Sequence, residues 1–178
     1  MALRLREISA VVVLVVGSYH RPMVDIVISS VQPADAGEIL TLQRAAYVTE
    51  AQLYDDVLLP PLTQTYQELA AELGSDLALK ATMGHRIVGS VRARFKGSVL
   101  HIGRLMVAPD LQGHGIGTRL LTAVERRAAG KADRYMLFTG RLSHANIRLY
   151  ERCGYIPVRE VPSEPAGVLI QLEKQADT

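Results

Sequence analysis

The chain has few of the residues that mark several common classes of protein. It has no tryptophan, only two phenylalanines and a single cysteine, Cys153, among 178 residues. One cysteine excludes an internal disulfide, and so few aromatic residues provide no stacking platform for single-stranded nucleic acid. The 20 Lys and Arg residues nearly balance the 18 Asp and Glu residues, so no strong field favours nucleic acid or an anionic membrane. The composition therefore predicts that neither nucleic acid nor a membrane is a partner.

The chain also lacks a metal-binding spacing and a run long enough to cross a bilayer. Its five histidines show no His-x-x-x-His pattern, so we predict no metal site. The apolar run at 8–16 follows Arg4 and Arg6, but a bilayer span takes about 20 apolar residues. No Ala-x-Ala cleavage site follows the run. We therefore expect a cytoplasmic protein whose functional domain covers residues 23–178, with residues 1–22 as an extension outside it.

Apolar periodicity divides the chain into strands and helices of one domain of ordinary size. β-branched residues predict a strand over 25–31, and Pro33 then opens an amphipathic helix that runs through Ala46. Gly84 and His85 separate two strand patterns and predict a hairpin. Further helices are predicted over 63–73, 116–128 and the segment after residue 143, and further strands over 77–83, 86–95, 99–107, 135–139, 156–161 and 168–172.

Two of these strands carry additional information. In strand 99–107, strict alternation would place Arg104 on the same face as Leu100 and Ile102, and a β-bulge near Gly103 and Arg104 would remove this conflict. Strand 135–139 is almost continuously apolar, which is typical of a strand that is covered on both faces and parallel to a neighbour.

The stretch from 105 to 121 predicts a strand, a glycine-rich turn and a helix. Gly113, Gly115 and Gly117 have no Cβ and tolerate positive φ where the turn reverses. The first turn of a helix has unpaired N–H groups and the positive end of its dipole, so this turn can hold a phosphate. A plain strand-to-helix connection is the alternative. The dinucleotide fingerprint does not fit, because residues 108–111 separate the strand from the glycines, and the Gly-Lys-Ser/Thr of a P-loop is missing.

Two motifs give the chain a more specific resemblance. Gln112-x-x-Gly115-x-Gly117, behind Val107-x-Pro109, resembles the acyl-CoA signature of the GNAT superfamily of acetyl-CoA-dependent N-acetyltransferases. A later segment resembles the family's conserved helix: Tyr150, Gly154 and Tyr155 match, while Ser143 stands at the usual asparagine and Asn146 lies one turn later. The resemblance implies an α/β (α+β) fold with a mixed, mostly antiparallel central sheet of six to seven strands and about four flanking helices.

The resemblance also implies acetyl-CoA as cosubstrate and the residues that hold it. Backbone groups of the bulged strand would bind the pantetheine arm, and an N–H at Met106 or Val107 would stabilise the oxyanion. Tyr150 matches the family's general acid. The positions implied at the cofactor are Leu105, Met106, Val107, Gln112, Gly113, His114, Gly115, Ile116, Gly117, Thr118, Ser143, Asn146 and Tyr150.

The general base and the acceptor are less determined. Many family members supply a glutamate from the fourth strand, where this chain has Gly103 and Arg104. Glu50 is our candidate for the base, directly or through water, and His101 is the alternative. Asp55 and Asp56 favour a cationic acceptor. Three arginines on the central strands favour an acidic one, and the choice stays open: Arg92, Arg94 and Arg104.

The sequence thus predicts transfer of an acetyl group to a primary amine, on a small molecule or a peptide, by direct attack through a tetrahedral intermediate. A non-catalytic acyl-CoA sensor is the alternative, because the strand carboxylate is missing. A nucleotide-binding regulatory domain without CoA is a third hypothesis, weakened by the missing fingerprints. The sequence leaves the oligomeric state open, a homodimer included.

Overall fold

The computed structural model describes residues 25–75, 77–163 and 167–176. The predicted extension, residues 1–22, lies outside the described residues. Within them, a mixed sheet of seven strands has the order β1-β2-β3-β4-β5-β7-β6. The strands are β1 (Ile26–Ser30), β2 (Leu77–Met83), β3 (Arg86–Lys96), β4 (Val99–Val107), β5 (Arg134–Gly140), β6 (Ile156–Ser163) and β7 (Gly167–Gln175).

Only the pairing of β4 with β5 is parallel, and the other five pairings are antiparallel. This pairing involves the central strand β4, and the connection between the two strands contains helix α4, as is usual for parallel strands. The mixed, mostly antiparallel sheet expected from the family resemblance is confirmed.

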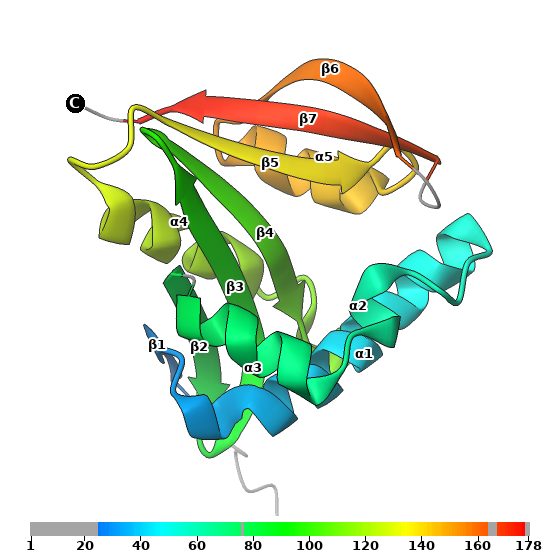
Figure 1. The fold of residues 1–178 in the computed structure, drawn as a ribbon, viewed down its shortest axis with the longest axis vertical. Coiled ribbons are helices and arrows are strands. Elements are labelled where there is room, and N and C mark those ends of the chain that lie inside the picture. The colour runs from blue at the N-terminus through cyan, green and yellow to red at the C-terminus, as the bar shows by residue number, and fades with distance from the viewer. Residues whose placement is uncertain (1–24, 76, 164–166, 177–178) are drawn as a thin grey trace, which may run out of the picture.

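The helices cover different parts of the two sheet faces (Figure 1). Their bounds are α1 (Ala36–Tyr54), α2 (Pro60–Thr63), α3 (Tyr66–Ser75), α4 (Ile116–Ala128) and α5 (His144–Arg152), with 3₁₀ turns η1 (Pro33–Asp35) and η2 (Pro109–Leu111). Helices α1 and α3 pack on one face, with α1 against β3 and β4. Helix α4 packs on the opposite face against β2, β3 and β4, and α5 lies beside it below β5 and β7. No helix of the described residues is long and apolar enough to cross a membrane.

The local signals placed most of these elements correctly, with one exception around the two prolines. The sequence predicted a break at Pro60 and Pro61 followed by one helix over 63–73. Instead, Pro60 occupies the first turn of the short helix α2, and α3 begins at Tyr66. The reason is a capping box, because Thr65 Oγ1 accepts the N–H of Glu68 while Glu68 Oε2 accepts the N–H of Thr65.

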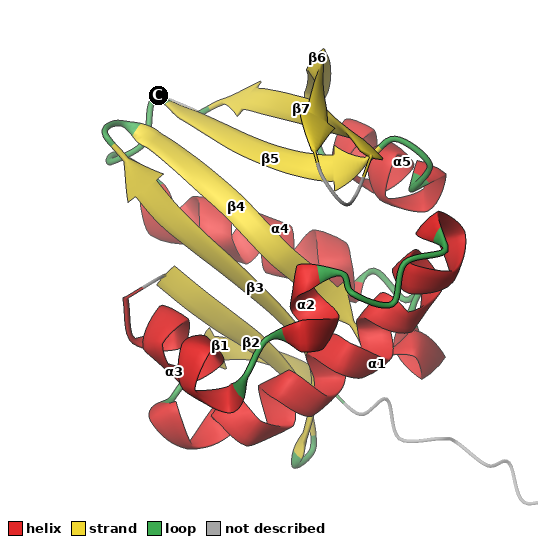
Figure 2. Cartoon of the chain, turned by 45° about the vertical axis from the view of Figure 1, so that its right-hand side comes forward, coloured by secondary structure: helices red, strands yellow, loops and turns green. Residues whose placement is uncertain are grey.

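Strand β5 is parallel to β4 as predicted, but the expectation that both its faces are covered is wrong. Tyr135 and Leu137 are buried on the α4 side. On the α1 side, Met136 is half-buried and Phe138 is 42% exposed. Because α1 and α3 cover mainly the other end of the sheet, this face of β5 lies open in front of α1 (Figure 2).

Candidate functional site

The chain leaves β4 through a turn that ends in helix α4. Gly113 and Gly115 have φ of 81° and 77°, a conformation that glycine adopts without strain. A Cβ at either position would meet nothing within 4 Å, so the surface beside the turn is open. Gly115 is the N-cap residue of α4 and provides no side-chain cap, which leaves the first backbone N–H groups of the helix to an external acceptor. The turn has the geometry of an anion site.

The third glycine has a different role from the predicted one. Gly117 is buried in the first turn of α4 and is not among the glycines with positive φ. A Cβ there would lie 3.5 Å from Cδ1 of Leu149 in α5 and 3.8 Å from Cγ2 of Val107. These are ordinary van der Waals distances, so a small side chain would fit at Gly117, and the expectation of a positive φ is wrong for this residue.

The other residues of the turn divide into exposed side chains and one core side chain. Gln112, His114 and Thr118 are exposed. Gln112 Nε2 donates to the carbonyl oxygen of Val107 at 3.4 Å, which connects the turn to the end of β4. The side chain of Ile116 is only 2% exposed, so Ile116 can offer a ligand its backbone alone.

Strands β4 and β5 separate beside this turn. Their ladder ends at the pair Ile102 and Leu137, although β4 continues to Val107 and β5 to Gly140. The register of β4 against β3 shifts at the same place, and Arg104 has φ of 50°. The bulge predicted at Gly103 and Arg104 is thus confirmed. Beyond it, the β4 edge that faces β5 has no ladder partner among the described residues. Apart from the Val107 carbonyl oxygen, which accepts from Gln112 Nε2, the backbone groups of residues 105–107 that point toward this edge can bind a ligand.

Helix α1 reaches across to the end of β5 and the start of α5. Ser143 Oγ donates to Glu50 Oε2 at 2.6 Å, and Asn146 Nδ2 donates to Glu50 Oε1 at 3.0 Å. One turn later, Tyr54 Oη accepts the N–H of Leu142 at 2.8 Å. Two residues expected at the cofactor, Ser143 and Asn146, therefore hold the carboxylate that was expected to be the base.

Tyr150 lies on α5 beside this contact and is 8% exposed. Its ring packs edge to face with Tyr155, with 6.1 Å between the ring centroids. Burial raises the pKa of Tyr150 above its usual value, and Tyr47 and Glu50 raise it further. The phenol is therefore protonated at neutral pH and can act as a hydrogen-bond donor.

This arrangement of splayed strands, glycine turn and paired helices agrees with a family match. The model of the acetyltransferase (GNAT) family matches residues 41–155, well over half of the chain. The chain belongs to the GNAT acetyltransferase family. Members of this family use acetyl-CoA, and the matched segment contains both the glycine turn and Tyr150. No curated protein sequence matches the chain.

Solved structures show the same fold at low sequence identity. The ribosomal-protein-S18-alanine N-acetyltransferase from Escherichia coli is 18% identical with a TM-score of 0.68, and the match covers 86% of this chain and 96% of that one. Aminoglycoside 6'-acetyltransferase type Ii is 22% identical with a TM-score of 0.67, over 85% and 98% of the two chains. The putative acetyltransferase yncA from Salmonella typhimurium, solved with acetyl-CoA, is 17% identical with a TM-score of 0.69, over 86% and 95%.

The positions considered for a general base differ in their surroundings. His101 is half-buried on β4. Its burial lowers its pKa, and the positive charges of Lys96 and Arg134 lower it further, so the ring is neutral at pH 7. Asp55 is exposed and ends α1 with φ of 49°. Asp56 Oδ1 accepts the N–H of Leu58 at 2.8 Å, so this carboxylate organises the loop after α1. Within the described residues, no group of three or more His, Cys, Asp and Glu side chains could hold a metal ion.

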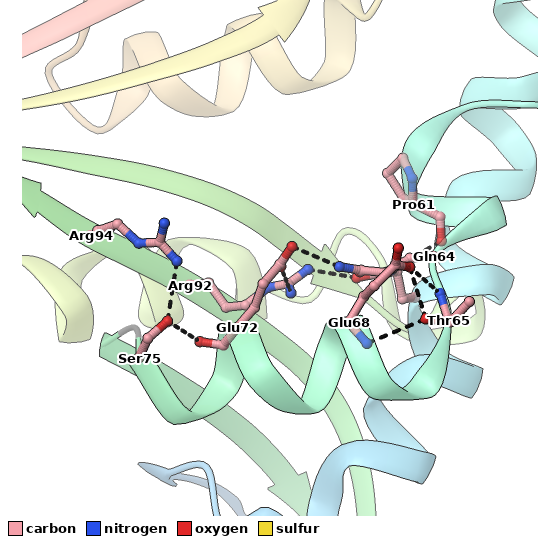
Figure 3. A network of polar contacts seen from close by, with 9 residues as sticks. Pro61, Gln64, Thr65, Glu68, Glu72, Ser75, Arg92 and Arg94 are labelled. Atoms are coloured by element: carbon pink, nitrogen blue, oxygen red, sulfur yellow. Dashed lines mark hydrogen bonds and ion pairs between the residues drawn. The ribbon is translucent and has the colours of Figure 1, made fainter.

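A buried polar network that the sequence did not indicate lies between α1, α3 and β3 (Figure 3). Arg92 is 3% exposed, forms an ion pair with Glu72 and donates to Gln43 Oε1 at 2.7 Å. Gln64 links Gln43 to Glu72 with bonds of 2.9 and 2.8 Å. The expectation that Arg92 helps to attract an acidic acceptor is wrong, because its guanidinium is buried in this network. The sequence feature that could have predicted this network is Gln43, a polar residue four positions after Ile39 on the apolar face of a helix.

Proposed function

We propose that this protein is an N-acetyltransferase that transfers the acetyl group of acetyl-CoA to a primary amine by direct attack. The observation that carries the proposal is the separation of β4 from β5 at the bulge, beside the open turn at Gly113 and Gly115. The separated edge of β4 offers backbone groups to an extended chain that carries amides. The glycine turn offers N–H groups to phosphate. Acetyl-CoA carries both amides and phosphates.

The residues present fit acetyl-CoA. The N–H groups at the start of α4 would hold the pyrophosphate, where the positive φ of the two glycines allows close approach. The free edge of β4 at residues 105–107 would hold the pantetheine amides. Bound acetyl-CoA supplies an activated thioester. The protein supplies the position of the thioester carbonyl and the charge stabilisation around it.

Three tasks remain for the chain itself. A backbone N–H at Met106 or Val107 would stabilise the oxyanion, a contribution of several kcal/mol in a site that excludes water. Tyr150 would donate a hydrogen bond to the departing sulfur. Because the raised pKa of its phenol lies well above the thiol value of about 8.5, we expect a hydrogen bond rather than full proton transfer.

The third task is deprotonation of the amine, which we assign to Glu50, directly or through one water. Ser143 and Asn146 each occupy one oxygen of this carboxylate and so fix its orientation. Each oxygen retains a second lone pair for a proton. His101 is the alternative base, because its lowered pKa keeps it neutral.

A non-catalytic acyl-CoA sensor is the second candidate. It is favoured by Gly103 and Arg104, which stand on the bulge of β4 where many members of the family have the glutamate of the general base. Turnover separates the two functions, because a sensor binds acetyl-CoA but acetylates no amine.

The first experiment is a calorimetric titration of the full chain with acetyl-CoA, with ATP and NAD as controls. We expect micromolar binding of acetyl-CoA alone. The Gly115→Glu variant should lose it, because a carboxylate and a side chain would enter the phosphate position. Unchanged affinity in this variant, or preference for ATP or NAD, would contradict the proposal.

A further inference from the structure

Exposed apolar side chains gather where α1 ends next to the end of β5. Tyr54 joins the two segments, since its hydroxyl accepts the N–H of Leu142 and lies over Gly140, where an added Cβ would fall within 3 Å of the ring. The segments that this contact joins, the end of α1 with the loop after it and the end of β5 with the residues after it, carry five large hydrophobic residues with 42% to 76% of their surface exposed. This apolar rim consists of Leu53, Val57, Leu58, Phe138 and Leu142.

The rim adjoins the place where the reaction would occur. Phe138 is the first residue of β5 beyond the last ladder pair with β4, so it stands where the two strands separate. Side chains alternate along a strand, and Phe138 therefore shares a face with Gly140, over which Tyr54 of α1 lies. Phe138 thus lies on the same side of the sheet as Tyr54 of α1, opposite the side on which α4 packs.

The polar groups next to Phe138 are bonded to one another. Gln171 lies directly opposite Phe138 on β7 and is only 4% exposed. Its Oε1 accepts from Arg159 Nε at 2.8 Å, and its Nε2 donates to Glu173 Oε1 at 2.6 Å. Glu173 also pairs with Arg134 at 3.3 Å. The charges beside Phe138 on β7 and β6 are therefore paired with one another.

The loop after α1 likewise presents apolar side chains. Asp56 Oδ1 accepts the N–H of Leu58, a contact within the loop. The turn leaves Val57 76% exposed and Leu58 67% exposed. The end of β5 and the loop after α1 therefore both expose apolar side chains, with the exposed Asp55 between Leu53 and Val57.

We propose that the acceptor is a primary amine carried on an apolar group of about the size of a ring, which packs against Phe138 and Leu142. This inference rests on the proposed N-acetyltransferase function. The burial of Phe138 by such a group would add binding that a small polar amine cannot obtain.

The test compares amines that differ only in the group behind the amine: phenethylamine, ethanolamine, putrescine and glutamate. With the full chain and saturating acetyl-CoA, we expect kcat/KM for phenethylamine to exceed the other three by about tenfold or more. Phe138→Ser should abolish this preference while the acetyl-CoA Kd stays unchanged. Phe95→Ser is the matched control, because Phe95 is the other phenylalanine and is similarly exposed, at 38%, and it should keep the preference.

The outcomes separate the inference from the function on which it rests. Failure to bind acetyl-CoA in the titration would overturn the proposed function. Binding of acetyl-CoA with acetylation of none of the amines would favour the sensor, and so would overturn the inference together with the proposed function. Binding of acetyl-CoA together with equal use of the amines, preference for a polar amine, or a preference that survives Phe138→Ser would overturn the inference alone.

Discussion

Replacement of Gly89 by alanine tests how closely α4 packs on the sheet. A Cβ at this position of β3 would lie 2.8 Å from Leu120 Cδ1, 3.1 Å from the carbonyl oxygen of Met106 and 3.2 Å from Ile116 Cγ2. Leu120 and Ile116 belong to α4 and are 0% and 2% exposed, so they have little room to move. The Met106 carbonyl is backbone of β4. Overpacking of this kind typically costs about 1–3 kcal/mol.

We expect Gly89→Ala to lower the free energy of unfolding by about 2 kcal/mol, which corresponds to a fall in Tm of about 4–8 °C at this chain length. Thermal unfolding followed by circular dichroism measures it. Because Ile116 opens α4, the phosphate-binding turn should also shift, and the acetyl-CoA Kd should rise several-fold. Gly103→Ala on the neighbouring strand is the matched control, since a Cβ there meets nothing within 4 Å. It should change stability by less than about 0.5 kcal/mol.

A double variant tests the stated cause. Leu120→Val removes the δ-carbon that a Cβ at Gly89 would strike, so Gly89→Ala with Leu120→Val should be less destabilised than the sum of the single variants. Additive effects in this cycle, or a Gly89→Ala protein that unfolds at the wild-type temperature, would refute the packing argument.

Two further predictions concern the titratable groups of the site. Burial raises the pKa of Tyr150, and burial together with Glu125 raises the pKa of Tyr155. Above pH of about 10, both phenols ionise in the unfolded chain but stay protonated in the folded chain. The stability that the two phenols contribute is therefore complete below pH of about 10 and is lost as the pH rises above it. The Tm measured from pH 8 to 11 should fall less steeply in a Tyr150→Phe, Tyr155→Phe variant than in the wild type. An equal slope in the two proteins would contradict the raised pKa values. Glu50→Gln should lower kcat/KM by about 100-fold or more, whereas Ser143→Ala, which removes only a hydrogen bond to Glu50, should lower it by less than about tenfold. A loss below about tenfold in Glu50→Gln would leave Glu50 as a contact between α1 and α5.

The conformation of the glycine turn and the bulge could both be predicted because each is encoded within a few residues. Gly113 and Gly115 adopt the positive φ expected of them. The conflict of Arg104 with the alternation of its strand predicted the bulge, and the φ of Arg104 confirms it. Glycine φ freedom and strand alternation act on neighbouring residues, so the sequence carries them directly.

The surroundings of the reacting groups could not be predicted in this way. Glu50 and Ser143 are 93 positions apart and still form a hydrogen bond. Arg92 was expected to favour an acidic acceptor and is instead buried, because α1 and α3 bring Gln43 and Glu72 to it. No local pattern specifies which polar residues meet when helices pack on a sheet.

By itself, the sequence determined the family, the order of strands and helices and the position of the glycine turn. The strands, helices and turn follow from backbone preferences and apolar periodicity within short segments, and the family follows from the resemblance of its two motifs. Only the tertiary structure decided which side chains are available for chemistry or recognition. It buried Arg92, exposed Phe138 and brought Glu50 to α5, because burial and contact depend on how segments far apart in the chain pack together.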